Sequence, residues 1–203
     1  MMLEEIGKRA RKAARALALT AGSQRAAALG AMAGRLMAQT ERILDANRAD
    51  LDQAMDEGMP AAMLDRLALN PARVADMARG LEEAAELPDP VGETLWEAQR
   101  PNGLVIRRVS VPLGVIAVIY EARPNVTADA AGLCLRAGNA CILRGGREAI
   151  RTNLAVAAAL RQALKDAGLD EDGVQLVEDT SRQSADALMR LDGYVDVLIP
   201  RGG

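Results

Sequence analysis

The sequence predicts an α/β protein in which helices cover both faces of a parallel β-sheet. Three observations lead to this fold class. After residue 112, short apolar segments alternate with helical segments, which is typical of parallel strands joined by crossover helices. Residues 1–90 are helical in pattern. Between these regions, residues 92–111 hold two strand-like segments around a turn, so we expect a β-hairpin there.

Capping and helix-breaking residues divide the N-terminal region into helices. Ser23 and Thr40 are the predicted N-caps of the second and third helices, and Asn70 is the predicted cap of the last one. Pro60 and Pro71 suit the first turn of a helix. The predicted helices are Leu3–Leu19, one from Ser23 to about Gln39, one from Thr40 to the break at Gly58-Met59-Pro60, a short one from Pro60, and one from Pro71 to about Leu87.

The hairpin is predicted from two β-rich segments and the turn between them. Its strands are Glu93–Glu97 and Leu104–Val109, and Pro101-Asn102-Gly103 forms the turn with Gly at its end. A hairpin in this position either projects from the protein or pairs with another segment. An oligomerisation arm is one role we consider for residues 92–111.

The C-terminal region, residues 113–203, reads as successive strand–helix units. The predicted strands are Val115–Ile119, Ala140–Leu143, Val174–Val177 and Val195–Ile199, and the helices between them are Thr127–Ala137, Thr152–Ala167 and Ser184–Leu191. In an open parallel sheet, ligands bind beyond the carboxyl ends of the strands. We therefore expect functional residues in the segments that follow the strands, which are Tyr120–Asn125, Arg144–Arg147, Glu178–Ser181 and Pro200–Gly203.

The composition argues against several classes of function. A net charge of −3 with one Trp, two Tyr and no Phe gives neither the charge nor the stacking surfaces of a nucleic-acid-binding protein. The absence of His removes Ser-His and Cys-His catalysis and most zinc sites, and we expect no metal. Cys134 and Cys141 are predicted to be buried free thiols in a reducing compartment. With no spanning apolar run and no secretion signal, we expect a cytoplasmic protein without a membrane partner.

Two Arg-Gly-Gly sequences suggest a ligand that carries phosphate. Arg144-Gly145-Gly146 and Arg201-Gly202-Gly203 each follow an apolar strand directly. Glycine lets the backbone approach a ligand closely, and arginine donates two parallel hydrogen bonds to phosphate. Neither the G-x-G-x-x-G fingerprint nor the P-loop sequence is present, so the common dinucleotide and NTPase motifs are not used.

Three longer motifs carry a family resemblance. YEARPNVT, GNACILRGG and LIPRGG, in this order, resemble the gamma-glutamyl phosphate reductases (glutamate-5-semialdehyde dehydrogenases) of the aldehyde dehydrogenase superfamily. The resemblance covers the whole chain but only about the first half of a family member. It implies an aldehyde-dehydrogenase-like, Rossmann-type sheet, with residues 1–203 forming an incomplete NADP-binding domain and the catalytic domain absent.

The resemblance also implies a reaction. Members reduce L-glutamyl 5-phosphate to L-glutamate 5-semialdehyde and phosphate with NADPH, in proline biosynthesis. A cysteine thiolate attacks the acyl carbon, and hydride then reduces the thioester. That cysteine lies beyond residue 203 and matches neither Cys134 nor Cys141, so we expect this chain alone to be inactive. A full-length member is expected to be a homo-oligomer with a functional link to glutamate 5-kinase. The alternative is a non-catalytic nucleotide-binding or assembly module.

The matching positions give each site residue an expected role. Asn125 would help hold the oxyanion, although an asparagine there could simply cap the following helix. Arg144 would contact the ribose that carries the extra phosphate of NADP, but could also be a surface charge, and Arg123 could instead pair with Glu121. The expected cofactor-binding residues are Tyr120, Glu121, Arg123, Pro124, Arg144, Gly145, Gly146, Arg201, Gly202 and Gly203.

Overall fold

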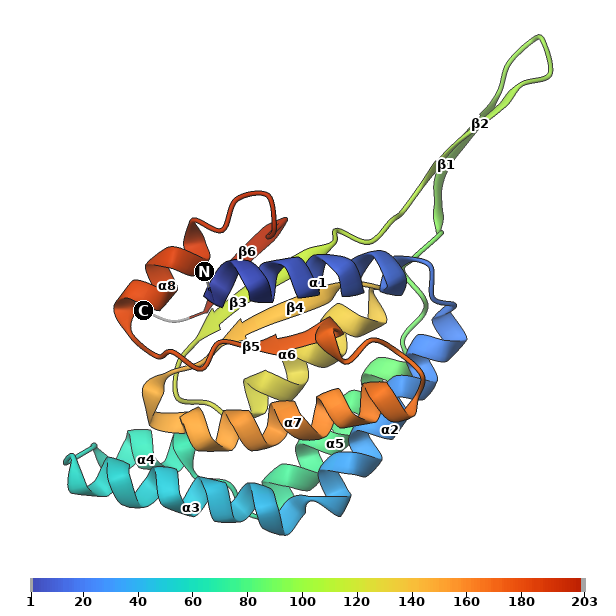
Figure 1. Cartoon of the computed structure of the whole chain (residues 1–203). Coiled ribbons are helices and arrows are strands. Elements are labelled where there is room, and N and C mark those ends of the chain that lie inside the picture. Colours follow the sequence, from blue (N-terminus) through green and yellow to red (C-terminus); the bar gives the residue numbers. More distant parts are fainter. Residues whose placement is uncertain (1, 202–203) are drawn as a thin grey trace.

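A four-stranded parallel sheet forms the centre of the protein (Figure 1). The computed structural model describes residues 2–201. The strands lie in the order β5–β4–β3–β6, and each adjacent pair is parallel. Their bounds are β3 Val115–Tyr120, β4 Ala140–Arg144, β5 Val174–Leu176 and β6 Val197–Arg201. The predicted α/β fold with four parallel strands is therefore confirmed.

Helices cover the sheet on both faces. α1 (Met2–Ala18) and α8 (Arg182–Met189) lie over one face, and α6 (Asn125–Arg136) and α7 (Ile150–Asp166) over the other (Figure 1). β4 lies between both helix layers, and its residues Ala140–Leu143 are fully buried and apolar. This double burial explains why the strands are continuous apolar runs rather than alternating ones.

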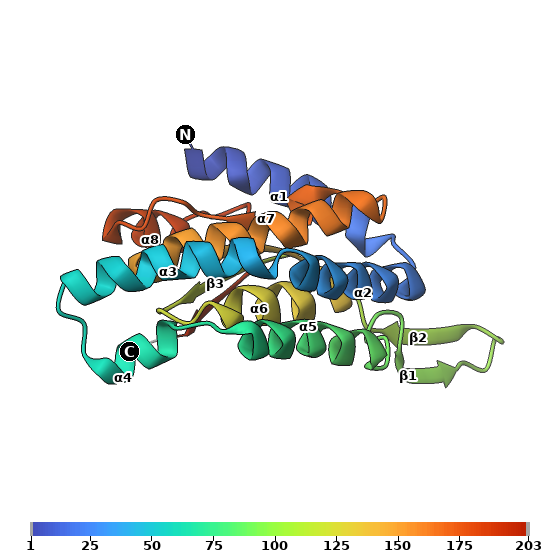
Figure 2. The same cartoon turned by 90° about the horizontal axis from the view of Figure 1, so that it is seen from below.

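An outer layer of helices packs on α6 and α7. It consists of α2 (Gly22–Ala38), α3 (Thr40–Asp56) and α5 (Pro71–Glu86), and the short α4 (Ala61–Leu67) joins α3 to α5 (Figure 2). Small residues allow close packing here, since a Cβ on Gly132 of α6 would lie 2.5 Å from a Leu81 methyl group of α5. No helix within residues 2–201 is long and apolar enough to cross a membrane.

Two of the predicted helix caps are wrong, and α8 begins earlier than predicted. α2 begins at Gly22, ahead of Ser23, because Gly22 packs against Asp89 and fixes the start through a tertiary contact. The Thr40 hydroxyl donates to carbonyls at the end of α2 and so does not cap α3. α8 begins at Arg182 and is capped by Ser181 rather than starting at Ser184. The Asn70 cap is confirmed by its bond from the Arg73 backbone N–H.

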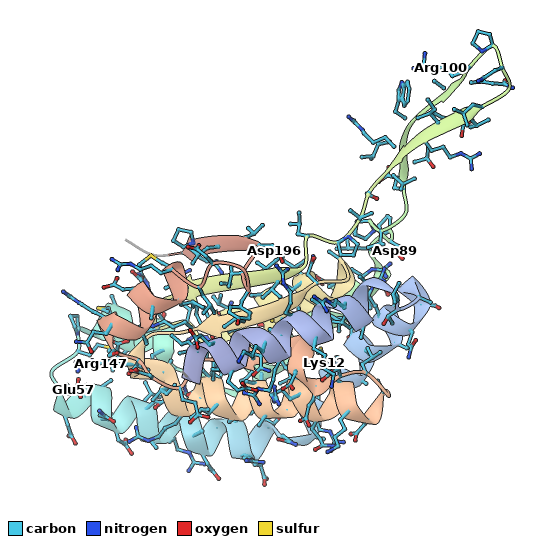
Figure 3. The ribbon with its side chains drawn as sticks, turned by 45° about the horizontal axis from the view of Figure 1, so that its top comes forward. Lys12, Glu57, Asp89, Arg100, Arg147 and Asp196 are labelled. Carbon is cyan, nitrogen blue, oxygen red and sulfur yellow. The ribbon has the colours of Figure 1, made fainter. Side chains whose placement is uncertain are left out.

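The predicted hairpin projects away from the body of the protein (Figure 1). β1 (Thr94–Gln99) and β2 (Val105–Val109) are antiparallel, and Gly103 adopts a φ of 84° in the connecting turn. Several apolar side chains on it are exposed, including Trp96 at 48%. We call residues 94–109 the arm; Figure 3 shows Asp89 at its base and Arg100 near its tip.

An ion pair between the buried Arg25 and the exposed Asp89 fixes the base of the arm. The Arg25 side chain is 1% exposed, and its Nη2 donates to both carboxylate oxygens of Asp89, at 2.7 and 2.9 Å. The Nε of Arg25 donates to the carbonyl of Arg136 at the end of α6. Arg136 in turn donates to the Leu87 and Gly22 carbonyls. These contacts join α2, α6 and the segment leading into the arm.

Candidate active site

The carboxyl ends of β3, β4 and β6 bring the predicted site residues to one edge of the sheet. Arg144 on β4 pairs in register with Ile119 on β3, and Arg201 on β6 pairs with Tyr120. The two arginines therefore flank the end of β3 on opposite sides. Parallel strands present their ends at the same edge, and the ligand-binding crevice of such sheets lies there.

A cleft of about 640 Å³ opens at this edge, and we call it the arginine cleft. Its lining includes five arginines and two glutamates, so its charge is positive on balance and suits an anionic ligand. Three of the segments expected to hold functional residues meet in it: the loop after β3, the turn after β4 and the loop after β5. The charged lining residues are Arg66, Arg123, Arg144, Arg147, Arg182, Glu121 and Glu148.

Arg144 is held in place by two backbone carbonyls. Its Nη2 donates to Thr180 at 2.5 Å and to Ser181 at 3.0 Å. Its Nε is buried and has no hydrogen-bond partner within residues 2–201. The guanidinium is therefore oriented by the protein while one buried donor is left for a ligand, so Arg144 is not simply a surface charge.

The Arg144 charge also acts on the loop after β5. The pKa of Asp179 lies below its ordinary value, first because the carboxylate accepts hydrogen bonds from Ser181 and also because Arg144 is near. An ionised Asp179 orders the Asp179–Ser181 turn, which presents the two carbonyls that hold Arg144. The loop and the arginine thus stabilise each other.

Gly145 and Gly146 are required by close approach of neighbouring groups. A Cβ on Gly145 would lie 2.2 Å from the Asn153 side-chain nitrogen and 3.1 Å from the Tyr120 ring. On Gly146 it would lie 2.5 Å from a Glu148 carboxylate oxygen and 3.3 Å from the Ala122 backbone nitrogen. The glycines therefore let the turn after β4 lie directly against the loop after β3, and Gly146 and that loop line the arginine cleft.

Tyr120 directs its hydroxyl into the protein. The side chain is 2% exposed, and the hydroxyl lies 2.7 Å from Thr127 Oγ1, which donates to Asn153 Oδ1 at 3.0 Å. Because Thr127 uses its hydrogen on Asn153, Tyr120 is the donor to Thr127. Burial raises the pKa of Tyr120 well above its ordinary value. Tyr120 thus borders the cleft as an uncharged residue that links β3 to α6 and α7.

Sequence reasoning missed Thr127 and Asn153. Each is a polar residue that is fully buried in a helix, and together with Tyr120 they form a chain of hydrogen bonds beneath the glycine turn. The Asn153 amide nitrogen has no partner within the described residues and faces Gly145. Their signal in the sequence is weak, because a threonine and an asparagine in helices usually face solvent.

Asn125 begins α6 without capping it. The N-cap residue is Pro124, and no side chain caps the helix there. The Asn125 amide nitrogen donates instead to Asp129 Oδ2 at 3.0 Å, one turn along the helix. The alternative interpretation, in which the Asn125 side chain caps the following helix, is therefore wrong. A side-chain amide carries two hydrogens, so one remains for a ligand.

A second cleft, of about 470 Å³, lies on the α4–α5 side of Asn125. Its lining carries charges of both signs, and we call it the mixed-charge cleft. Arg66 of α4 and Arg123 of the loop after β3 line both clefts, so the two are neighbours. Arg123 is exposed, and its backbone N–H donates to the Glu121 carbonyl at 2.7 Å, which tightens the loop before Pro124.

Arg201 lies at the end of β6 near the same loop. It lines a small hollow of about 220 Å³ together with Tyr120, Glu121 and Arg123. Partial burial raises the pKa of Asp129, whereas the bond from Asn125 and the nearby Arg201 charge oppose that rise. Gly202 and Gly203, the last two of the expected cofactor-binding residues, lie outside the described residues.

The two cysteines lie in the core, away from both clefts. Cys134 of α6 and Cys141 of β4 are free and buried. A hydrogen bond with Cys134 and burial hold the pKa of the Cys141 thiol well above its ordinary value. A nucleophile must be an accessible thiolate, and neither residue meets that requirement. Within residues 2–201 no cluster of three or more His, Cys, Asp or Glu side chains could hold a metal ion.

The fold, an α/β sheet with clefts at the carboxyl ends of its parallel strands, agrees with the family comparison. The model of the aldehyde dehydrogenase family matches residues 2–197, and the chain belongs to that family. Its curated relatives include gamma-glutamyl phosphate reductases that align over nearly the whole chain, so the resemblance carried by the three motifs is confirmed. The relative from Paramagnetospirillum magneticum is 52% identical over 202 residues, which are 100% of this chain and 48% of that protein.

Solved structures agree with the sequence relatives. The gamma-glutamyl phosphate reductase of Thermotoga maritima superposes with a TM-score of 0.97 at 39% identity, over 98% of this chain and 48% of that one. An engineered glycolyl-CoA reductase with bound NADP+ shares the fold at a TM-score of 0.69 and 20% identity, over 98% of this chain and 42% of that one. The chain thus spans about half the length of the curated relatives it matches.

Proposed function

We propose that this chain is the cofactor-binding part of an NADPH-dependent gamma-glutamyl phosphate reductase. The reaction is reduction of L-glutamyl 5-phosphate to L-glutamate 5-semialdehyde and phosphate in proline biosynthesis. The observation that carries the proposal is the arginine cleft, where Arg144 is oriented by Thr180 and Ser181 while its buried Nε has no partner within residues 2–201. The gamma-glutamyl phosphate reductases, one of which is 52% identical to this chain over 202 residues, support the choice of substrate.

The arginine cleft fits a dinucleotide with an additional phosphate. Arg144 would donate to the phosphorylated ribose, and the glycine turn after β4 would let the ligand approach the backbone. Exposed Arg182 and Arg147 border the same cleft and add positive charge. When bound, NADPH supplies the hydride. The loop Tyr120–Pro124 would flank the cofactor on the side nearer Asn125, and Arg201 with Gly202 and Gly203 would lie beneath the pyrophosphate.

Asn125 would stabilise the negative charge that develops on the acyl oxygen. Asp129 accepts one amide hydrogen and so fixes the direction of the other. The thiolate that attacks the acyl carbon would come from the part of the relatives that this chain does not span, since Cys134 and Cys141 are buried. On this proposal the 203-residue chain binds cofactor without turning over substrate.

The arm is the proposed contact between copies of the full-length enzyme. It projects from the body and carries exposed apolar side chains on both of its strands, among them Leu95, Trp96 and Val105. Apolar groups that remain exposed on a projecting hairpin are suited to pairing with another chain. A functional link to glutamate 5-kinase, whose product would be the substrate here, stays a prediction.

Calorimetric titration of the chain with NADPH tests the cofactor assignment directly. We expect saturable binding of NADPH that is weaker for NADH, because NADH lacks the phosphate assigned to Arg144. The second experiment measures phosphate-dependent reduction of NADP+ by L-glutamate 5-semialdehyde in a full-length reductase carrying this segment. Absence of that reaction would overturn the proposed function, whereas NADPH binding without it would favour the non-catalytic nucleotide-binding module.

A further inference from the structure

We propose that the mixed-charge cleft binds the amino-acid end of the substrate, with Asp129 recognising the α-ammonium group and Arg123 and Arg66 recognising the α-carboxylate. This subsite rests on the proposed function and adds to it the source of substrate specificity. It would make the enzyme accept the acyl phosphate of an α-amino acid in preference to acyl phosphates that lack these two groups.

The position of Asn125 places the subsite. If the Asn125 amide marks the acyl oxygen, the rest of the substrate extends from that point into a neighbouring cavity. Only two methylene groups separate the acyl carbon from the α-carbon of a glutamyl group, so its α-substituents must bind close to Asn125. The mixed-charge cleft begins at Asn125 and has room for a small amino acid at about 470 Å³.

The charges in this cleft fall into two sets. Asp65 pairs with Arg73 at 3.0 Å, and the same arginine donates to the Ala68 carbonyl. Asp76 forms an ion pair with Arg79, one turn along α5. These groups are engaged within the protein. The remaining charged residues of the lining are Arg66, Arg123 and Asp129.

Asp129 is suited to a cation. Its Oδ2 accepts the bond from Asn125, and Oδ1 has no hydrogen bond within residues 2–201, so it is available to an ammonium group. The carboxylate is partly buried, and burial raises its pKa. A carboxylate that has lost part of its hydration gains more from an arriving cation than one in water. Gly80 of α5 faces Oδ1 and adds no side chain there.

Arg66 and Arg123 supply the complementary charge from two separate elements. One is on α4 and the other on the loop between β3 and α6, and both are exposed side chains that line the cleft. The two guanidinium groups of the cleft complement the α-carboxylate of the substrate, and the Asp129 carboxylate complements its α-ammonium group. One positive charge of the protein is then left over. The spare charge faces the arginine cleft, since both arginines also line it.

The decisive experiment compares two aldehydes in the reverse reaction of a full-length reductase carrying this segment. In this direction the aldehyde, phosphate and NADP+ give the acyl phosphate, NADPH and a proton. L-Glutamate 5-semialdehyde carries both α-substituents, whereas 5-oxopentanoate lacks the ammonium group. Asp129→Asn keeps an oxygen that can accept the Asn125 hydrogen, so it should lower kcat/KM for L-glutamate 5-semialdehyde at least about tenfold more than kcat/KM for 5-oxopentanoate, because only the first aldehyde loses a partly buried charge pair. The matched control is Asp76→Asn in the same cleft.

An equal fall for both aldehydes would overturn the subsite, because it would mean that Asp129 acts only by orienting Asn125. Arg123→Gln and Arg66→Gln are tested in the same way against 4-aminobutanal, which lacks the carboxylate. Each should lower kcat/KM for L-glutamate 5-semialdehyde more than for 4-aminobutanal, and equal losses would remove the arginine from the subsite. NADPH affinity should not change in Asp129→Asn.

A binding measurement separates failure of the subsite from failure of the proposed function. NMR titration of the 203-residue chain compares L-glutamate with glutarate, which lacks the ammonium group. We expect glutamate to be bound more tightly and Asp129→Asn to remove the difference. If the full-length protein lacked reductase activity, the proposed function would fall, and this titration would still decide whether the cleft recognises an amino acid. No preference for glutamate would refute the subsite.

Discussion

The amide nitrogen of Asn125 lies 3.0 Å from a carboxylate oxygen of Asp129, one turn further along α6. This bond takes one of the two amide hydrogens and fixes the other in space. A residue that begins a helix at the ends of parallel strands thus presents an oriented donor to the mixed-charge cleft, which neighbours the arginine cleft.

Asn125→Ala should slow turnover of a full-length reductase carrying this segment by roughly 100-fold or more, which is the scale of losing one oxyanion donor. Affinity for NADPH should stay the same, because Asn125 does not line the arginine cleft. Steady-state kinetics and calorimetry measure the two effects. Turnover close to that of the unmodified enzyme would contradict the role of Asn125.

Arg144→Gln should weaken binding of NADPH to the chain more than binding of NADH. Glutamine keeps a donor for the Thr180 and Ser181 carbonyls but lacks the charge assigned to the extra phosphate. Calorimetry of both cofactors gives the ratio, and Arg79→Gln, a surface arginine of α5 paired with Asp76, is the control. Equal weakening for the two cofactors would exclude recognition of that phosphate by Arg144.

Gly145→Ala should destabilise the chain by about 1–3 kcal/mol, because the new methyl group overpacks a site that is already filled. It would lie 2.2 Å from the Asn153 side-chain nitrogen. Gly30→Ala in the exposed face of α2 is the matched control, since a Cβ there meets no atom within 4 Å. That substitution should stabilise the helix by about 0.5–1 kcal/mol. Urea unfolding measures both, and equal effects would contradict the close packing at Gly145.

Stability should fall in acid partly through Asp196. The carboxylate bonds to Arg11 and accepts the Val115 backbone N–H at 2.8 Å, and these bonds hold its pKa below the ordinary value of 3.8. Because the folded-state pKa is depressed, the stabilisation is fully present above the unfolded value and is lost as pH falls through the folded one. Asp196→Asn should therefore lower stability at pH 6 and flatten its decline below pH 4. If the free energy of unfolding in urea fell equally steeply below pH 4 in Asp196→Asn and in the unmodified chain, the linkage would be refuted.

Self-association of a full-length reductase carrying this segment should depend on the arm. Trp96→Ser removes a large apolar side chain that is half exposed in the isolated chain, and it should weaken the oligomer without altering NADPH affinity. Sedimentation velocity measures the oligomer, and Leu19→Ser, an exposed apolar residue at the end of α1, is the control. An oligomer that withstands Trp96→Ser and removal of residues 94–109 would show that the arm is not the contact.

The sequence predicted the layers of the fold better than the inside of the site. Buried parallel strands are continuous apolar runs, and Pro and Gly mark the connections, so strands and hairpin were accessible from pattern alone. Ser23 and Thr40 have the chemistry of caps, yet tertiary packing at Gly22 and the carbonyls of α2 decide their roles. The inward hydroxyl of Tyr120 depends on Thr127 and Asn153, which no local pattern brings together.

The mixed-charge cleft was beyond sequence reasoning for a related reason. The expectation that ligands bind beyond the strand ends pointed to Arg123 and Asn125. Arg66 belongs instead to α4, which joins two helices of the outer layer. Arg66 lies at the site because of the way α4 is positioned between α3 and α5. That position is set by helix packing and cannot be deduced from the spacing of apolar residues in the sequence. Asp129 reads as an ordinary helix residue until the three-dimensional contact with Asn125 is known.

α6 connects two places that are far apart in the molecule. Its first residue, Asn125, lies at the clefts, and the carbonyl of its last, Arg136, is held by Arg25 at the base of the arm. An α-helix rises about 1.5 Å per residue and resists compression. The distance between the Asn125 amide and the base of the arm is therefore fixed by a rigid helix and not by a loop. A full-length assembly held together by its arms would keep each amide at a fixed distance from the contact between subunits.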